Sequence, residues 1–233
     1  MNWLLLNSGP CAAAFNMALD EALLVAMPRL QAPVLRFYGW TEPAATFGYF
    51  QKFSEVERAT HFRPLIRRPT GGGIVPHDAD WTYAAIFPAG HAWHSLKAEA
   101  SYRHIHDWLR LAFAEMKVAT ELAPCCQKPA IGHRPSAIPS ACFIGHEKSD
   151  LLWHGKKIAG AAQRRNKLGL LIQGSVQPPV SLQRADFEQA MRGAAAIHFG
   201  VAWRDFPADN VLHAAAEKLA DEKFSQAGYN QKR

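Results

Sequence analysis

Cysteine is scarce in this chain, and its few cysteines are not spaced like metal ligands. The 233 residues include four, Cys11, Cys125, Cys126 and Cys142, two of which are adjacent. No pair has Cys-x-x-Cys spacing, and so few cysteines do not suggest a disulfide framework. The His146-Glu147 pair is not followed by a histidine at HExxH spacing, which excludes a metalloprotease helix. We therefore expect neither structural disulfides nor a bound metal.

Long apolar runs and long runs of positive charge are also missing. The first ten residues carry no positive segment, and the Trp3–Leu6 apolar patch is too short for a signal peptide or a membrane span. No run of lysine and arginine exceeds a few residues, so a nucleic-acid-binding stripe is not indicated. These absences predict a soluble, cytoplasmic protein that binds neither membrane nor nucleic acid.

The overall composition is that of an ordinary globular domain with a basic surface. Hydrophobic residues make up 48% and charged residues 20% of the chain, which suits one domain over residues 1–233. The formal net charge is +6. Such a charge favours acidic partners, whether nucleic acid, a phosphate-bearing cofactor or an acidic protein, although it is equally consistent with a surface that is merely soluble.

Hydrophobic periodicity predicts an α+β fold. The spacing of apolar residues indicates one helix near the start of the chain, one in the middle and two near the end, with extended segments between these regions. The expected helices are Phe15–Met27, Leu96–Lys117, Arg184–Arg192 and Ala208–Phe224. The expected strands are Val34–Tyr38, Ala45–Phe50, Leu65–Arg68, Trp81–Phe87, Asp150–Trp153, Lys156–Arg164 and Gly169–Gln177. This order argues for a mixed, mostly antiparallel sheet flanked by helices and against regular βαβ alternation. On the second helix, His104 and His106 are expected to be surface residues.

A triple glycine follows the third expected strand. Gly71, Gly72 and Gly73 allow positive φ angles and close approach of a ligand to backbone N–H groups. Arg67 and Arg68 precede them, and at least one is expected to supply positive charge. The alternative is a loop that needs glycine for its geometry alone. The spacing matches neither a dinucleotide-binding fingerprint nor a P-loop.

A lysine-bearing strand carries unusually small residues. Lys157 is followed by Gly160, Ala161 and Ala162, where a strand would normally carry large side chains. Small residues make room for another group, and a lysine facing that room would pair with an anion or an acyl oxygen. The alternative is a solvated Lys156-Lys157 pair at a turn.

Cys142 is the cysteine with a candidate chemical role. A lone cysteine is usually a small buried hydrophobe and becomes a nucleophile when a nearby cation stabilises its thiolate. Lys157 and His146 are the candidates by sequence proximity. Cys125 and Cys126 are expected to be bystanders.

Together these segments resemble the lipoate–protein ligase and octanoyltransferase superfamily, which also includes biotin ligases. The resemblance rests on six segments in the family's order, which are Asn16–Leu23, Leu35–Trp40, Phe47–Gln51, Arg68–Gly73 with His77 and Asp78, Lys157–Gln163, and Gln173–Ser175. It implies a catalytic domain with a tunnel for an acyl chain, without a C-terminal accessory domain. It also implies that Arg68, Gly71, Gly72, Gly73, His77 and Asp78 flank the acyl head group on one side, and Lys157, Gly160 and Ala162 on the other.

Two enzymatic mechanisms and one non-catalytic role fit this resemblance. The position and context of Cys142 resemble the nucleophile loop of cysteine-dependent octanoyltransferases, with Cys142 and Lys157 as the catalytic pair. Such an enzyme would take octanoyl from octanoyl–acyl carrier protein, without a cofactor, and pass it to a lysine of a lipoyl domain or the glycine cleavage H protein. The intact glycine triplet resembles ATP-dependent lipoate–protein ligases equally, and these need ATP and Mg²⁺. A lipoyl-binding module without activity is the third interpretation.

Overall fold

The main element is an eight-stranded mixed sheet. The computed structural model describes residues 1–126, 145–178 and 182–232. The sheet strands are β1 (Asn2–Cys11), β2 (Val34–Trp40), β6 (Trp81–Pro88), β7 (Glu121–Leu122), β8 (Leu151–Trp153), β9 (Lys156–Asn166), β10 (Gly169–Val176) and β11 (Ala202–Asp205). Their spatial order is β11-β1-β2-β6-β10-β9-β8-β7. The β11–β1 and β1–β2 pairs are parallel, and the other neighbouring pairs are antiparallel.

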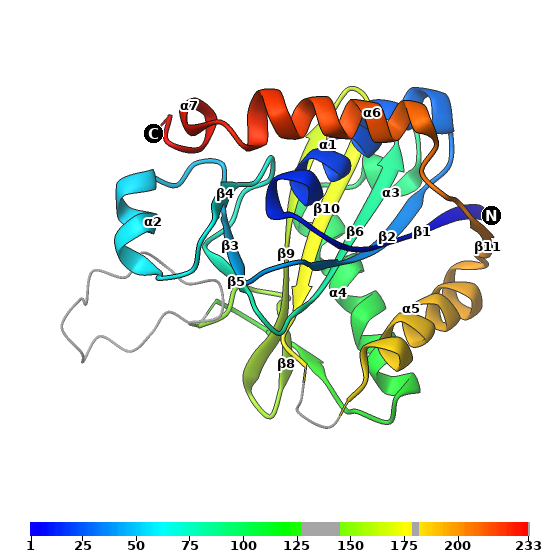
Figure 1. The fold of residues 1–233 in the computed structure, drawn as a ribbon. Helices are drawn as coiled ribbons and strands as arrows, with labels where there is room; N and C mark the ends of the chain where they lie inside the picture. Colours follow the sequence, from blue (N-terminus) through cyan, green and yellow to red (C-terminus); the bar gives the residue numbers. More distant parts are fainter. Residues whose placement is uncertain (127–144, 179–181, 233) are drawn as a thin grey trace.

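Helices cover both faces of this sheet (Figure 1). They are α1 (Ala13–Leu30), α2 (Phe53–Ala59), α3 (Ala92–Ser95), α4 (Ala98–Glu115), α5 (Arg184–Phe199), α6 (Asn210–Leu219), the π-helical turn η1 (Ala220–Phe224) and α7 (Ala227–Asn230). Helices α1 and α6 pack together on one face, and α4 and α5 pack together on the other. Each face therefore has its own apolar core.

Strand β1 shows how the sequence serves both cores. Trp3 and Leu5 belong to the core beneath α4 and α5, whereas Leu4 and Leu6 belong to the core beneath α1 and α6. Side chains of a strand alternate between faces, so a strand covered on both sides reads as one continuous apolar run. The short Trp3–Leu6 patch is therefore a central core segment.

A second, three-stranded sheet projects from the main one. It has the order β4-β3-β5 and consists of β3 (Ala44–Phe47), β4 (Leu65–Arg67) and β5 (Val75–His77). Its small core includes Ala45, Phe47 and Val56. The triple glycine lies between β4 and β5, so this sheet fixes the glycine loop at its two ends.

The α+β class and the mostly antiparallel sheet are confirmed. The strands expected near residues 34, 65, 81, 156 and 169 all form, with ends shifted by a few residues. The helix expected over Leu96–Lys117 forms as α4, shorter by two residues at each end, because Leu96 and Lys97 have extended backbone; the short α3 that precedes them was not predicted. The parallel edge formed by β1 and β11, together with α2 and α7, was not predicted, because these segments are short or lack clear periodicity. No helix among residues 1–126, 145–178 and 182–232 is long and apolar enough to cross a bilayer.

Candidate active site

The glycine loop is closed by the arginine that precedes it. The Arg68 guanidinium donates to the carbonyl oxygens of Gly71 at 2.9 Å and Gly73 at 2.7 Å. Gly72 has φ of +90°, and a Cβ at Gly48 would lie 1.9 Å from the Gly72 carbonyl oxygen. Both glycines are therefore required by the backbone itself. The loop thus needs glycine for its geometry, and the buried guanidinium of Arg68 also places positive charge beside it.

Lys157 is a buried ammonium paired with a buried carboxylate. Its Nζ lies 2.8 Å from Asp150 Oδ2, and the two side chains are 5% and 0% exposed. The Tyr102 hydroxyl donates to the other oxygen of Asp150, and the Glu147 backbone N–H donates to Oδ2 at 2.7 Å. A buried pair of this kind persists only when further hydrogen bonds satisfy both charges. Lys157 is thus held in one position and is not a solvated lysine. Of the Lys156-Lys157 pair, only Lys156 is exposed.

A break in the strand register accompanies this placement of Lys157. On β8 and β9, Leu151 pairs with Ala159 but Leu152 pairs with Lys157, so β9 carries an extra residue at this point. Bulges of this kind reorient side chains and are frequent beside active sites. The bulge itself has no signal in the local sequence pattern.

Gly160 makes room for the lysine. A Cβ on Gly160 would lie 2.8 Å from Lys157 Cε and 2.9 Å from Nζ. The Lys157 side chain therefore folds back along its own strand and rests against the Gly160 α-carbon. The space that Gly160 leaves open, which the sequence pattern assigned to another group, is occupied by the Lys157 side chain.

This contact gives a direct prediction for Gly160→Ala. The new methyl group would push the ammonium away from Asp150, because the lysine end is the flexible partner in the contact. We expect the turnover of any reaction at this site to fall roughly 10-fold to 100-fold, which corresponds to about 1.4–3 kcal/mol of transition-state stabilisation. Steady-state kinetics would measure this. Gly193→Ala in α5 is the matched control, because a Cβ at this position would lie 3.9 Å from its nearest neighbour, Glu115 Oε2. This variant should keep full turnover. Equal activity of the two variants would contradict the prediction.

The glycine loop and the lysine strand border one cavity. Gly72 and Arg68 line it from the loop, and Gly160 and Ala162 line it from β9. The cavity is narrow, with about 40 Å³ of space for the centres of water-sized molecules, and its remaining wall is formed by Met17, Tyr38, Thr46, Val75, His77, Thr82, Ala161, Gln173, Gly174 and Ser175. Most of the exposed surface of this wall is apolar, and the buried Arg68 guanidinium lines it beside the glycine loop. Such a cavity suits an apolar chain with a polar head group.

His77 belongs to a directed chain of hydrogen bonds on one wall of the cavity. Its Nδ1 lies 2.9 Å from Asp80 Oδ2, and its Nε2 lies 2.7 Å from Thr46 Oγ1. Thr46 Oγ1 also accepts from Arg68 at 2.9 Å. Because Arg68 can only donate, the threonine hydroxyl proton is free to donate to Nε2, and the Nδ1 proton points to Asp80. The imidazole ring stacks on Trp40, with 3.8 Å between ring centroids. This chain fixes Arg68 and thereby the glycine loop.

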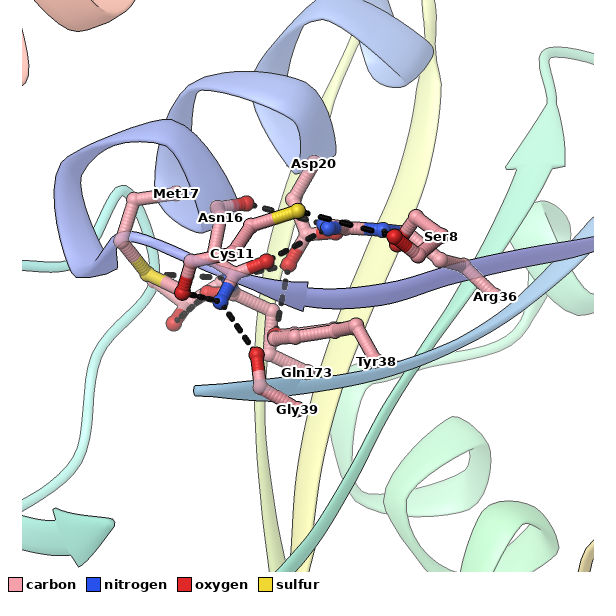
Figure 2. A network of polar contacts seen from close by, with 10 residues as sticks. Ser8, Cys11, Asn16, Met17, Asp20, Arg36, Tyr38, Gly39 and Gln173 are labelled. Atoms are coloured by element: carbon pink, nitrogen blue, oxygen red, sulfur yellow. Dashed lines mark hydrogen bonds and ion pairs between the residues drawn. The ribbon is translucent and has the colours of Figure 1, made fainter. Parts of the chain in front are cut away.

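A second buried network connects α1 to strands β2 and β10 (Figure 2). Asp20 accepts from Arg36 at 2.6 Å, from the Tyr38 hydroxyl at 2.9 Å and from Gln173 at 2.7 Å. The amide oxygen of Gln173 in turn accepts from the Thr70 hydroxyl at 2.7 Å. Burial and the neighbouring Asp20 carboxylate raise the pKa of Tyr38 well above its usual range, so this hydroxyl stays a donor. Segments that the sequence singled out separately thus converge on the base of the cavity.

Arg67 faces away from the cavity. It is fully buried and donates to the Asn230 carbonyl oxygen at 2.9 Å and to those of Tyr49 and Gln51 at 2.7 Å. Its backbone N–H donates to the Asn230 side chain at 2.8 Å. Arg67 therefore anchors the α7 turn against β4, and of the two arginines only Arg68 lines the cavity.

A family comparison agrees with this geometry. The family model described as the lipoyl protein ligase A/B catalytic domain matches residues 12–203, which include the lysine strand, the glycine loop and α1. The chain belongs to this lipoyl protein ligase A/B family. The resemblance seen in the sequence is therefore confirmed.

The similar proteins have names of two kinds, octanoyltransferase and lipoate protein ligase. The octanoyltransferases LipM of Geobacillus kaustophilus and Bacillus subtilis are 35% and 36% identical to this chain, over 75% of it and 64% of their own length. The chain thus spans just under two thirds of these relatives. A structure of lipoate-protein ligase A bound with ATP superposes with a TM-score of 0.77 at 19% identity, covering 99% of both chains. A bi-partite lipoate protein ligase from Thermoplasma acidophilum, described with its E2 lipoyl domain, gives 0.71 at 18% identity, covering 99% of this chain and 96% of its own. These two likenesses establish the fold.

Asp78, which the family resemblance also placed beside the acyl head group, does not line the cavity. Asp78 is exposed and accepts from the Ala79 backbone N–H, lining a separate hollow beside Trp40. Cys142 lies outside the described residues. Cys125 and Cys126 are exposed, and a hydrogen bond to the Glu147 carboxylate raises the pKa of the Cys126 thiol, which disfavours a thiolate.

Three residues of the site were missed by reasoning from the sequence. The pattern marks Asp150 only as the first residue of an expected strand, and the carboxylate that binds His77 is Asp80, to which no motif points. His106 was expected at the surface, but it is buried against Tyr102, with 4.4 Å between ring centroids. An acidic residue that immediately precedes an apolar strand, as Asp150 does, is the signal that could have found the lysine partner.

Proposed function

We propose that this protein is an octanoyltransferase that acylates a lysine side chain of lipoyl domains or of the glycine cleavage H protein. The donor would be octanoyl–acyl carrier protein, with an enzyme thioester on Cys142 as the intermediate. The observation that carries the proposal is the buried Lys157 ammonium, which Asp150 fixes against Gly160, a residue that lines the apolar cavity under the glycine loop. The names of the LipM relatives support octanoyl transfer in particular.

The chemistry has two steps that share one oxyanion. Cys142 gives up its proton and the thiolate attacks the thioester carbonyl carbon; the carbon–sulfur bond to the carrier breaks, the carrier thiolate leaves and takes up that proton, and a new thioester remains on the enzyme. The lysine amine of the acceptor then attacks that thioester, an amide forms, and the cysteine thiol is regenerated as the amine loses a proton. Each tetrahedral intermediate places negative charge on the carbonyl oxygen. A fixed ammonium such as Lys157 stabilises that charge most when it needs no rearrangement.

The Asp150 carboxylate would act as a positioning group in this scheme. Because it is completely buried and bonded to Tyr102, Glu147 and Lys157, it holds the ammonium at one edge of the cavity. Arg68 and His77 would keep the glycine loop closed over the opposite edge. The apolar wall would hold the octanoyl chain, which offers no hydrogen bonds and gains free energy from leaving water.

Mass spectrometry can test the cysteine step directly. After incubation with octanoyl–acyl carrier protein, the wild-type protein should carry one octanoyl group on Cys142 that hydroxylamine removes. Cys142→Ser should form no thioester, whereas Cys125→Ser should be acylated like the wild type. Formation of lipoyl-adenylate from ATP and lipoate, with full activity in Cys142→Ala, would instead establish an ATP-dependent ligase. Binding of lipoyl domains without either reaction would establish a non-catalytic module.

A further inference from the structure

A cationic hollow lies on the outer side of the glycine loop. Gly71 and Pro69 form one edge of it, so the hollow and the acyl cavity, which Gly72 lines, are separated by the loop itself. The hollow is open to solvent and is lined further by Tyr49, Phe50, Gln163, Arg164, Lys223, Tyr229 and Lys232. Nothing in the proposed acyl-transfer chemistry uses these residues.

Three positive side chains converge on this hollow against one carboxylate. Arg164 lies 3.2 Å from Glu21 Oε1, and Lys223 pairs with Glu21 Oε2. The Lys232 ammonium lies over the rings of Tyr49 and Tyr229, at 4.0 Å and 4.3 Å from their centroids. The net charge of these groups is therefore positive by two. Several converging cations in a concave site are the arrangement that phosphate groups favour.

The walls of the hollow are firmly held. Lys232 and Tyr229 stand on either side of Asn230, whose backbone and side chain are both bonded to the buried Arg67. Phe50, which is 73% exposed, stands at the rim with its ring 5.2 Å from that of Tyr49. The hollow thus combines fixed cations with an aromatic rim, which would pack against an apolar or amide-bearing chain.

Strand β9 connects the hollow to the reactive lysine. Gly160 and Ala162 line the acyl cavity, and Arg164, the next residue on the same face, reaches Glu21 on α1. Because a strand rises about 3.3 Å per residue, Arg164 lies about 13 Å along β9 from Gly160. The Lys157 ammonium rests against Gly160. A ligand that reaches from the hollow to the ammonium must therefore be a chain of roughly this length.

The arm of an acyl carrier protein has these dimensions. About thirteen bonds separate its phosphorus from its sulfur, which gives about 16 Å when the chain is extended like a polypeptide backbone. Resting on the proposed function, we infer that the hollow binds the phosphodiester of the carrier's phosphopantetheine arm. The arm then runs past Gly71 and along β9, and its thioester lies at Lys157. The phosphate contact selects the donor and sets the depth to which the thioester enters.

A matched pair of small donors tests this inference. Octanoyl-4′-phosphopantetheine and octanoyl-pantetheine differ only in the phosphate. For the wild type, kcat/KM of enzyme acylation should be about tenfold higher with the phosphorylated donor. In Lys223→Gln/Lys232→Gln the preference should shrink to less than about twofold, with the rate for octanoyl-pantetheine unchanged. Lys218→Gln, an exposed lysine on α6, is the control and should keep the preference.

Two results would overturn the inference. One is a wild-type protein that does not distinguish the two donors, and the other is a double variant that slows both donors equally. ATP also carries phosphate, so its binding is measured by calorimetry in parallel. ATP binding that weakens in the double variant, without any preference between the two donors, would assign the hollow to a nucleotide and overturn the phosphopantetheine site.

Binding without chemistry separates this inference from the proposed function. Calorimetry with 4′-phosphopantetheine and with pantetheine, neither carrying an acyl group, measures the phosphate contribution alone. Equal affinities would overturn the phosphate site even if octanoyl transfer proceeds. Tighter binding of 4′-phosphopantetheine by a protein that transfers no acyl group would contradict the proposed transferase and support the phosphate site.

Discussion

Replacing Lys157 with alanine should lower the proposed acyl transfer by about a hundredfold to a thousandfold. The ammonium is the fixed positive charge that rests against Gly160 at the cavity edge, and removal of one such oxyanion donor from an enzyme typically costs a factor of this size. The loss should appear in kcat, since the charge it stabilises develops only in the transition state. Single-turnover acylation followed by mass spectrometry measures this step separately from product release.

The same substitution should also destabilise the protein. Lys157→Ala leaves the completely buried Asp150 carboxylate without its partner, and breaking a buried pair in this way typically costs about 3–5 kcal/mol. A loss of activity in Lys157→Ala alone would therefore not separate catalysis from folding. In Lys157→Ala/Asp150→Asn the uncompensated charge is removed, so we expect much of the stability to return while activity stays low.

Denaturant unfolding and turnover measured on both variants decide between the two roles. Restored stability together with restored activity would show that Lys157 is a purely structural partner of Asp150. Near-wild-type turnover in Lys157→Ala itself would refute the placement of the active site at this lysine. Lys156→Ala is the matched control, because that neighbouring lysine is exposed and should change neither quantity.

Acidification should destabilise the protein by about 3 kcal/mol between pH 6.5 and pH 4 through His106. Burial lowers the pKa of this histidine to about 4, despite the hydrogen bond from its Nδ1 to the Tyr102 carbonyl oxygen. In the unfolded chain the pKa would be about 6.5. As the pH falls through this window, the unfolded state takes up the proton first, so the folded state loses up to about 1.4 kcal/mol per pH unit.

His106→Asn isolates this contribution. The amide can still donate to the Tyr102 carbonyl oxygen but does not titrate, so the variant should show a much flatter dependence between pH 6.5 and 4.5. Above pH 7 the two proteins should differ by a constant amount. Urea unfolding at several pH values measures both curves. Parallel curves for wild type and His106→Asn would show that other groups cause the acid sensitivity.

Much of the fold was within reach of the sequence because its periodicities are strong. Strands such as Trp81–Pro88 and Gly169–Val176 are continuous buried segments bounded by turn residues, and α1 repeats its apolar residues at helical spacing. The glycine loop and the lysine strand were each recognised from composition. Their meeting across one cavity came from the family resemblance, because no local pattern encodes which strands become neighbours.

The residues missed at the site depend on contacts between distant segments. Asp150 meets Lys157 through a register break, and Asp80 meets His77 through the turn before β6. His106 is buried beside Tyr102, one turn earlier on α4, and near enough to Asp150 and Lys157 for their charges to act on its pKa, although the sequence places it beside exposed polar residues. In each case the deciding factor is the three-dimensional environment of a polar side chain, which tertiary packing sets.

The attachment of Asn230 to Arg67 joins positions that are 163 residues apart. Removing the last few residues would take away the Asn230 hydrogen bonds of the fully buried Arg67 guanidinium. Arg67 directly precedes Arg68, the arginine that closes the glycine loop. A truncated protein with poor turnover would then resemble an active-site mutant although no reacting group had been altered. The α7 turn would therefore support the active site from a distance. A loss of activity after deletion of this turn should be attributed first to the altered structure around Arg67.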